Sequence, residues 1–172
     1  MSTSIVFTFI GNDKPGLVEK LSNTVSEQGG NWLESRMSQL AGYFAGIARI
    51  QISNDKADQL RAALNALSGE DLSINLEDRA IDDNTSDYTN IKLSLLGNDR
   101  PGIVKELSSA LAALQINVCE MNTNVTSAPM TAESLFAASA EIQAPITLDL
   151  AQLTDRLDEI ANQLDVDIRL EN

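Results

Sequence analysis

The chain is strongly acidic: its 172 residues include 12 Lys and Arg, 25 Asp and Glu and no His, giving a formal charge of −13. An apolar fraction of 43% can build the core of one ordinary domain or of two small ones, which excludes an intrinsically disordered chain. No run approaches the ~18 apolar residues of a membrane span, and the start lacks a secretory signal, so we expect a soluble, cytoplasmic protein without a membrane partner.

The residue types also narrow the chemistry. Without His, and with Cys119 as the only cysteine, the chain lacks the usual metal ligands and the usual general base. We therefore expect no metal site, no cofactor and no enzymatic activity, and we expect Cys119 to be a small buried hydrophobe. No basic cluster is present to neutralise phosphates, and residues 81–172 alone carry a net charge of −10, so direct binding to nucleic acid is not expected.

A repeat organises the chain. At an offset of 86 residues, segment 11–22 aligns with segment 97–108, and eight of these twelve positions are identical. The alignment continues without a gap to Asn31 over Asn117 and to Glu34 over Glu120. It predicts two copies of one domain. We place the first copy at 1–80, a polar linker at 81–89 and the second copy at 90–172.

Each copy begins with an alternating run, 4–10 in the first and 90–96 in the second, which predicts a strand. Pro15 and Pro101 follow at positions where a first helical turn tolerates a missing N–H. Apolar residues then recur at helical spacing, among them Leu17, Val18, Leu21 and Val25 in the first copy and Ile103, Val104, Leu107 and Leu111 in the second. The first of these helices ends at Gly29-Gly30, and Gln115 takes that place in the second copy.

Two further extended stretches in each copy predict a hairpin, and the loop of the second hairpin is about six residues longer. The hairpin strands are 32–40 and 43–52 in the first copy, and 118–125 and 135–142 in the second. A second amphipathic helix follows, with Asn54 or Asp55 as the expected cap in the first copy and Thr147 in the second. Each copy closes with a short alternating strand, 72–76 or 166–170.

The resulting order, βαββαβ, folds most simply as an α+β, ferredoxin-like domain in which a four-stranded antiparallel sheet carries two helices on one face. An RNA-recognition module of this topology would need aromatic strands and a basic surface, and the chain is only 4% aromatic. Each sheet leaves an edge and a face exposed, which two copies, or two chains in a homodimer, can cover.

The repeated motif carries a family resemblance. Asn12-Asp13-Lys14-Pro15-Gly16 with Asn31, and Asn98-Asp99-Arg100-Pro101-Gly102 with Asn117, resemble the ACT domain, a small regulatory module that binds amino acids. A tandem pair looks most like the glycine cleavage system transcriptional repressor family. That resemblance implies a non-enzymatic regulator that senses a small amino acid and acts on a protein partner, a DNA-binding activator of glycine or one-carbon metabolism.

The motif has its own binding chemistry. A helix N-terminus favours a carboxylate, a glycine allows close approach, and Asp and Asn oxygens accept from an ammonium group. We therefore expect the turn and the second-strand Asn of each copy to form a zwitterion pocket. The candidate ligand-binding residues are Asn12, Asp13, Gly16 and Asn31 in the first copy, and Asn98, Asp99, Gly102 and Asn117 in the second.

Some relatives carry a His two residues before the acidic or Asn position of the motif, where this chain has Gly11 and Gly97. The resemblance therefore implies a pocket built mainly from backbone and suited by size to glycine or serine. Glu34 and Glu120 recur too, and together with Asn12 and Asn98 they form a second rank of candidates.

A purely structural interpretation remains open at this stage. Asp13 and Asp99 can be helix caps, the prolines helix starters and the glycines packing positions, which would make the chain a ligand-free interaction or dimerisation module. Trp32, beside Asn31, can be either an ordinary strand aromatic or a pocket wall. Motifs like Asp99–Val104 also open the regulatory half of formyltetrahydrofolate deformylase-like enzymes, but here a second copy follows instead of a catalytic domain.

Overall fold

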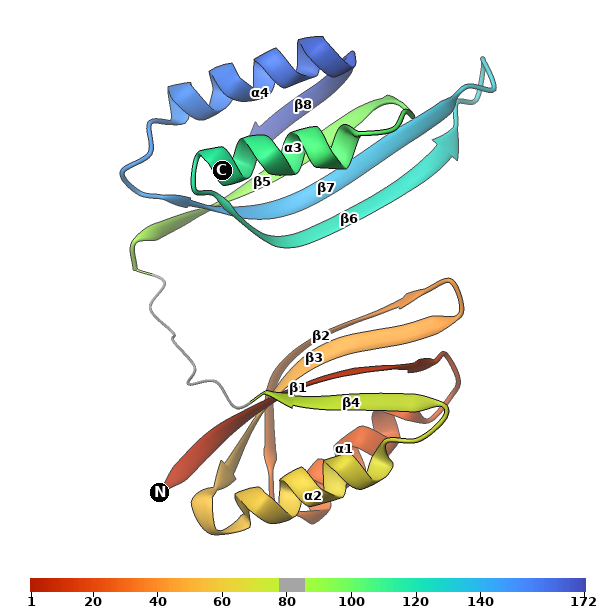
Figure 1. The fold of residues 1–172 in the computed structure, drawn as a ribbon, viewed down its shortest axis with the longest axis vertical. Coiled ribbons are helices and arrows are strands. Elements are labelled where there is room, and N and C mark those ends of the chain that lie inside the picture. The colour runs from red at the N-terminus through yellow and green to blue at the C-terminus, as the bar shows by residue number, and fades with distance from the viewer. Residues whose placement is uncertain (78–85) are drawn as a thin grey trace. The chain divides into compact units, whose positions relative to one another are not determined.

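The computed structural model describes residues 1–77 and 86–172, which form two βαββαβ units (Figure 1). The chain divides into the compact units Met1–Asp82 and Asp83–Asn172. Positions 81–85 of the expected linker lie outside the described residues, and the first strand of the second unit begins at Tyr88, two residues earlier than expected.

Both units have the same topology. The first contains β1 (Ser2–Asn12), α1 (Leu17–Glu27), β2 (Asn31–Leu40), β3 (Tyr43–Ser53), a 3-10 turn η1 (Asn54–Lys56), α2 (Ala57–Leu67) and β4 (Leu72–Glu77). The second contains β5 (Tyr88–Asn98), α3 (Ile103–Ala113), β6 (Asn117–Ser127), β7 (Ser134–Pro145), α4 (Leu150–Leu164) and β8 (Val166–Glu171). The strand orders are β2-β3-β1-β4 and β6-β7-β5-β8, with every pair antiparallel.

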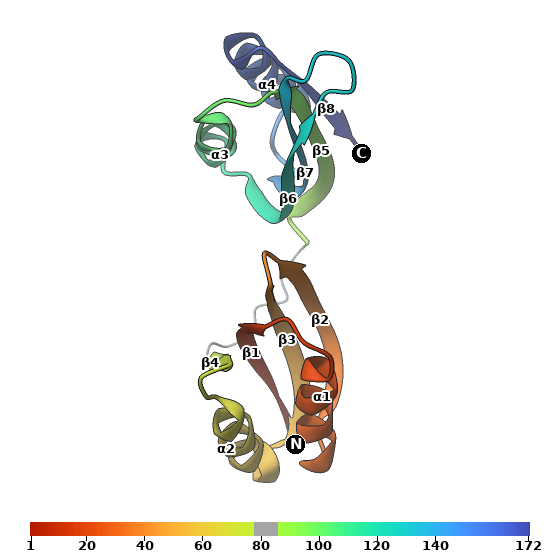
Figure 2. The ribbon, with the colours of Figure 1, turned by 90° about the vertical axis from the view of Figure 1, so that its right-hand side faces the viewer.

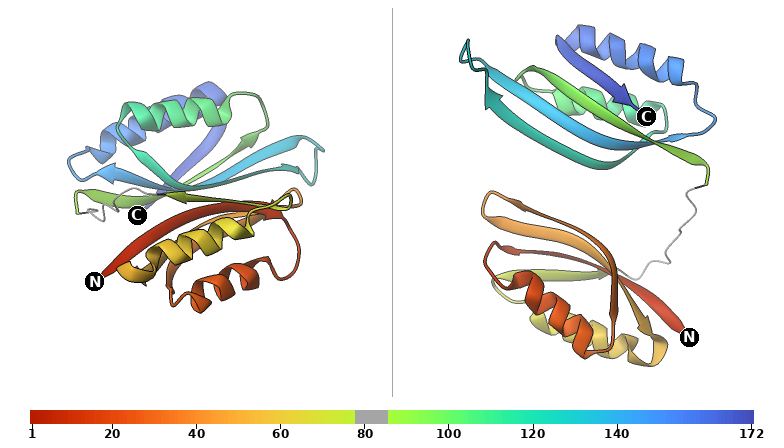
Figure 3. Two further views of the ribbon diagram at one scale, coloured as in Figure 1. Left: turned by 60° about the horizontal axis from the view of Figure 1, so that its bottom comes forward. Right: turned by 180° about the vertical axis from the view of Figure 1, so that it is seen from behind.

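In each unit the two helices cover one face of the sheet, and the other face carries no helix of that unit (Figures 1 and 3). Figure 2 shows the first unit turned by 90°, with α2 standing apart from the strands of its sheet. The α+β, ferredoxin-like prediction is therefore confirmed.

The core lies between the helices and the sheet, on the face that the alternation predicts. The inward residues of the first strands are at most 3% exposed: Ile5, Phe7 and Phe9 in β1, and Ile91, Leu93 and Leu95 in β5. Leu17, Leu21 and Val25 of α1 belong to the first core and pack on the helix-covered face of its sheet. Val18 and Val104 lie in α1 and α3, as the helical spacing predicts, but they are 40% and 44% exposed at the start of each helix.

The edge strands β2 and β6 each contain an irregularity at an equivalent place. The pairing register shifts between Trp32 and Glu34, and between Val118 and Glu120. Cys119 falls in the second shift and is exposed, so the expectation of a buried cysteine was wrong, because a residue at a bulge drops out of the alternation. Trp32 packs edge-on against Phe7, with ring centroids 6.0 Å apart, and is therefore a half-buried strand aromatic.

Helix termini match the sequence only in part. Gln115 has a positive φ of 59°, as expected for the residue that ends the first helix of the second copy. The N-cap of α4 is Asp149, whose carboxylate accepts from the backbone N–H of Ala151, and not Thr147. No side chain caps α2, since η1 precedes it and its N-cap is Lys56. The expected cap at Asn54 or Asp55 was therefore wrong.

Candidate functional site

The repeated motif forms the turn between the first strand and the first helix of each unit. Gly16 and Gly102 are the N-caps of α1 and α3, with φ of 91° and 96° and no side-chain cap. Pro15 and Pro101 therefore lie before the cap and outside the first helical turn. The suggestion that Asp13 and Asp99 cap these helices was wrong, because the left-handed glycine takes the cap position and has no side chain.

A glycine is needed at this cap for its backbone angles, since a positive φ is costly for residues with a Cβ. An added Cβ would meet no atom within 4 Å at either Gly16 or Gly102. The space beside each glycine is therefore open in its own unit. The first N–H groups of α1 and α3 receive no capping side chain, which leaves them available to an anion.

Asp13 and Asp99, the acidic residues of the motif, have backbone N–H groups that are hydrogen-bonded and side chains that are exposed. The Asp13 N–H donates to the Gly42 carbonyl at 2.9 Å, and the Asp99 N–H donates to the Ser134 carbonyl at 2.8 Å. Within residues 1–77 and 86–172, neither carboxylate has a hydrogen-bond partner. Each turn therefore presents an acidic side chain without a partner beside the start of a helix.

Asn12 is held by a residue that sequence reasoning missed. Its Nδ2 donates to Oδ1 of Asp71 at 3.0 Å, and Lys14 Nζ lies 3.1 Å from Oδ2 of the same carboxylate. Asp71 lies in the connection between α2 and β4, outside the segment that aligns at the offset of 86 residues, so the repeated motif did not mark it. Asn98, the equivalent of Asn12, makes no side-chain hydrogen bond within the described part of its unit.

The second-strand asparagines lie far from the turns of their own units. Asn31 is opposite Gln51, and Gln51 is opposite Ser4, so Asn31 is level with the start of β1. Asn12 is eight residues further along β1, roughly 27 Å away at 3.4 Å per residue. Asn117 is likewise level with Asn90, eight residues from Asn98. No single unit brings its turn and its second-strand Asn into one pocket, contrary to our expectation.

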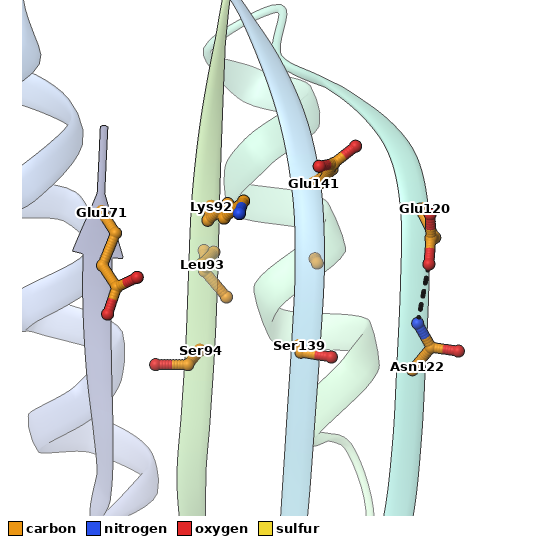
Figure 4. A pocket seen from close by; sticks show the side chains of 9 residues that line it. Lys92, Leu93, Ser94, Glu120, Asn122, Ser139, Glu141 and Glu171 are labelled. Atoms are coloured by element: carbon orange, nitrogen blue, oxygen red, sulfur yellow. Dashed lines mark hydrogen bonds between the residues drawn. The ribbon is translucent and has the colours of Figure 1, made fainter.

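The second-rank glutamates lie on the strands and away from the turns. Glu34 forms an ion pair of 3.2 Å with Arg49. Glu120 accepts from Asn122 Nδ2 at 3.0 Å, and both line a hollow of about 270 Å³ on the second sheet, together with Lys92 and Glu141 (Figure 4). Apart from the second-rank Glu120, this hollow is lined by none of the candidate ligand-binding residues.

Across the described ranges, no three His, Cys, Asp or Glu side chains gather closely enough to hold a metal ion. No helix of residues 1–77 or 86–172 is both long and apolar enough to cross a membrane.

Comparison with known proteins identifies the fold family. The ACT domain model matches residues 3–76 and 90–171. The crystal structure of an unknown protein from Galdieria sulphuraria matches with a TM-score of 0.86 and 26% identity, covering 99% of this chain and 98% of that one. The structure of a "putative glycine cleavage system transcriptional repressor" matches with a TM-score of 0.73 and 19% identity, covering 99% and 97%. No curated protein matches. With the model matched twice along its length, the chain belongs to the ACT domain family.

Proposed function

We propose that this tandem ACT protein is a non-enzymatic regulator that binds a small amino acid at a strand-to-helix turn and thereby changes its association with a protein partner. Glycine and serine are the favoured ligands. The partner is a regulator of transcription of glycine or one-carbon metabolism, in line with the described role of the similar repressor structure. The partner, and not this acidic chain, would contact DNA.

The observation that carries the proposal is the pairing of opposite charges at each turn. Uncapped N–H groups at the start of the helix favour the carboxylate of an amino acid. The carboxylate of Asp13 or Asp99, close by in the chain, is an acceptor for the ammonium group. Gly16 and Gly102 have no side chain, so a ligand can come close to the backbone of the turn. This favours a ligand that is held largely by backbone groups.

Binding would act on the partner by shifting a population. A ligand can favour one conformation or one assembly only by the difference between its affinities for the two states. The exposed apolar side chains Val18 and Val104, beside the turns, give a bound ligand or a partner an apolar surface to contact.

A ligand-free interaction module is the second candidate, favoured by the placement of the asparagines. Asn31 and Asn117 each begin an edge strand, β2 or β6, at the end of the sheet opposite the turn. Long exposed edge strands are surfaces for pairing with another chain, including a second copy of this one. In this function the repeated motif would only build the turn.

A thermal-unfolding panel separates the two candidates. The purified protein is heated with each of the twenty amino acids at millimolar concentration, and a ligand at 100 times its Kd stabilises the folded state by about 2.7 kcal/mol. We expect a selective rise in Tm for glycine or serine, which Asp13→Ala or Asp99→Ala abolishes. Glu27→Ala, which removes an exposed carboxylate at the far end of α1, is the matched control and should keep the response.

A flat panel together with a dimer in light scattering would overturn ligand sensing in favour of the interaction module. Turnover of an amino acid or a formyl-folate by the purified protein would overturn the non-enzymatic role.

A further inference from the structure

The two units differ in the chain that faces the repeated turn. Four residues, 68–71, connect α2 to β4, whereas Asp165 alone connects α4 to β8. In the first unit the longer connection contacts the turn: the Asp71 carbonyl accepts from the Asn12 N–H at 3.1 Å, and its carboxylate accepts from both Asn12 Nδ2 and Lys14 Nζ. Gly11 permits this approach, because a Cβ there would lie 2.6 Å from the Asp71 carbonyl oxygen.

The second unit has no equivalent of these contacts. Arg100, at the place of Lys14, reaches only the Gln163 carbonyl at a long 3.5 Å. Asp165 makes no side-chain hydrogen bond to the turn in the described part of the unit. In the described part of the second unit, the turn therefore has one weak contact with the last turn of α4, whereas the first turn makes three hydrogen bonds to its connection.

A hollow of about 470 Å³ lies between the turn and the connection of the first unit. Its polar lining has both signs of charge, since Lys14 and Lys20 come from the turn and α1, and Glu70 and Asp71 come from the connection, with Lys14 and Asp71 paired to each other. Lys20 has no ion pair within the residues described. Charges of both signs facing one hollow suit a zwitterion, whose carboxylate and ammonium groups each need an opposite charge.

The charge at the position of Lys20 is reversed in the second unit, where the repeat offset places Glu106. An amino-acid carboxylate is attracted by a lysine at this position and repelled by a glutamate. The neighbouring position is reversed in the other sense, Glu19 against Lys105, but Glu19 does not line the hollow.

We propose that the first unit alone holds the amino acid, in the hollow between the turn and residues 68–71, and that Asp71 is the residue that positions Asn12 and Lys14 for it. This inference rests on the proposed function. Lys14 and Lys20 line this hollow and attract the ligand carboxylate, and Glu70, also in its lining, offers an acceptor for the ligand ammonium. Asn12 does not line the hollow itself, and its hydrogen bond to Asp71 helps to fix the turn beside it. A turn ordered before binding loses less conformational entropy when the ligand arrives.

The test is isothermal titration of glycine and of serine into the full chain and into two pairs of variants. We expect one site per chain. Lys20→Glu should weaken binding roughly tenfold, since it exchanges an attractive charge for a repulsive one, while Glu106→Lys should leave Kd within about twofold. Asp71→Asn should weaken binding about fivefold, and Asp165→Asn, its counterpart, should not change it.

A positioning role makes a further prediction that a structural role does not. Lys14 and Asp71 are both more than half exposed, so their ion pair adds little to the free energy of unfolding, and Asp71→Asn should leave the midpoint of unfolding in urea nearly unchanged. If Asp71 acts through Lys14 and Asn12, its effect on Kd should largely disappear in a background of Lys14→Met and Asn12→Ala. An equal effect in both backgrounds would refute the positioning role.

The outcomes distinguish this inference from the function on which it rests. If no amino acid binds the wild-type chain, ligand sensing itself fails. If the wild type binds two molecules per chain, or if Glu106→Lys and Asp165→Asn change Kd while Lys20→Glu and Asp71→Asn do not, sensing stands and its assignment to the first unit is wrong.

Discussion

Replacing Gly16 by alanine isolates the backbone cost of the turn. Gly16 has φ +91°, and an added Cβ would meet no atom within 4 Å, so alanine introduces no clash. The left-handed region costs a residue with a Cβ roughly 1–2 kcal/mol. Alanine also restricts the unfolded chain and recovers up to about 0.4–1 kcal/mol of that cost. We therefore expect Gly16→Ala to lower the free energy of unfolding by about 1 kcal/mol, with an unchanged m-value in urea.

Gly69 provides the matched control, because it also has open space around it but does not lie in the left-handed region. Gly69→Ala should be neutral or stabilising by up to about 1 kcal/mol. Gly11→Ala is the opposite case and should cost more than Gly16→Ala, since its Cβ would press on the backbone at Asp71. If Gly16→Ala is as stable as Gly69→Ala, the positive φ does not explain the glycine, and a contact outside this unit must require it.

Three further predictions test the core, a helix cap and the cysteine. Phe7→Ala should lower the free energy of unfolding in urea by about 3–5 kcal/mol, because Phe7 is fully buried. Leu40→Ala, at a position that is 77% exposed, should cost less than about 0.5 kcal/mol. Equal losses for the two variants would refute the assigned core. Asp149→Ala should lower the free energy of unfolding by about 1 kcal/mol, because it removes the carboxylate that caps α4. Asp149→Asn should retain most of the stability, and an equal loss in both variants would contradict capping. The exposed thiol of Cys119 should react with a thiol reagent in the native protein at nearly the rate seen in urea, and protection by folding would contradict its place in the bulge.

The fold could be predicted from the sequence because burial on one face of a strand or helix imposes a regular spacing of apolar residues. Ile5, Phe7 and Phe9 alternate because a strand with one covered face turns every second side chain into the core, and all three are buried. Helical spacing placed Val18 in α1 correctly, but it does not give the burial of each apolar residue, and Val18 is 40% exposed next to the buried Leu17. The burial of Cys119 was expected from its residue type alone, and it was wrong because Cys119 lies at a register shift in an edge strand that nothing local in the sequence marks.

The candidate site was less predictable, since it depends on contacts between distant segments. The repeat marked Asn12 and Asp13 but could not show that Asp71, 59 residues beyond Asn12, orients the Asn12 amide. Nor could it show that Asn31 lies at the other end of the sheet, because that distance follows from the register of three strands and not from the spacing of the motif.

The duplication itself separates what the fold requires from what a ligand would require. Gly16 and Gly102 share the same backbone angles, so their recurrence is accounted for by the turn and adds nothing in favour of binding. The informative positions are those where the units share a backbone and differ in charge, such as Lys20 and Glu106, because a difference that the fold does not need has to be explained by what each unit contacts. The two units can thus be compared with each other within one chain. Exchanging a residue between them changes the candidate site while the fold stays the same.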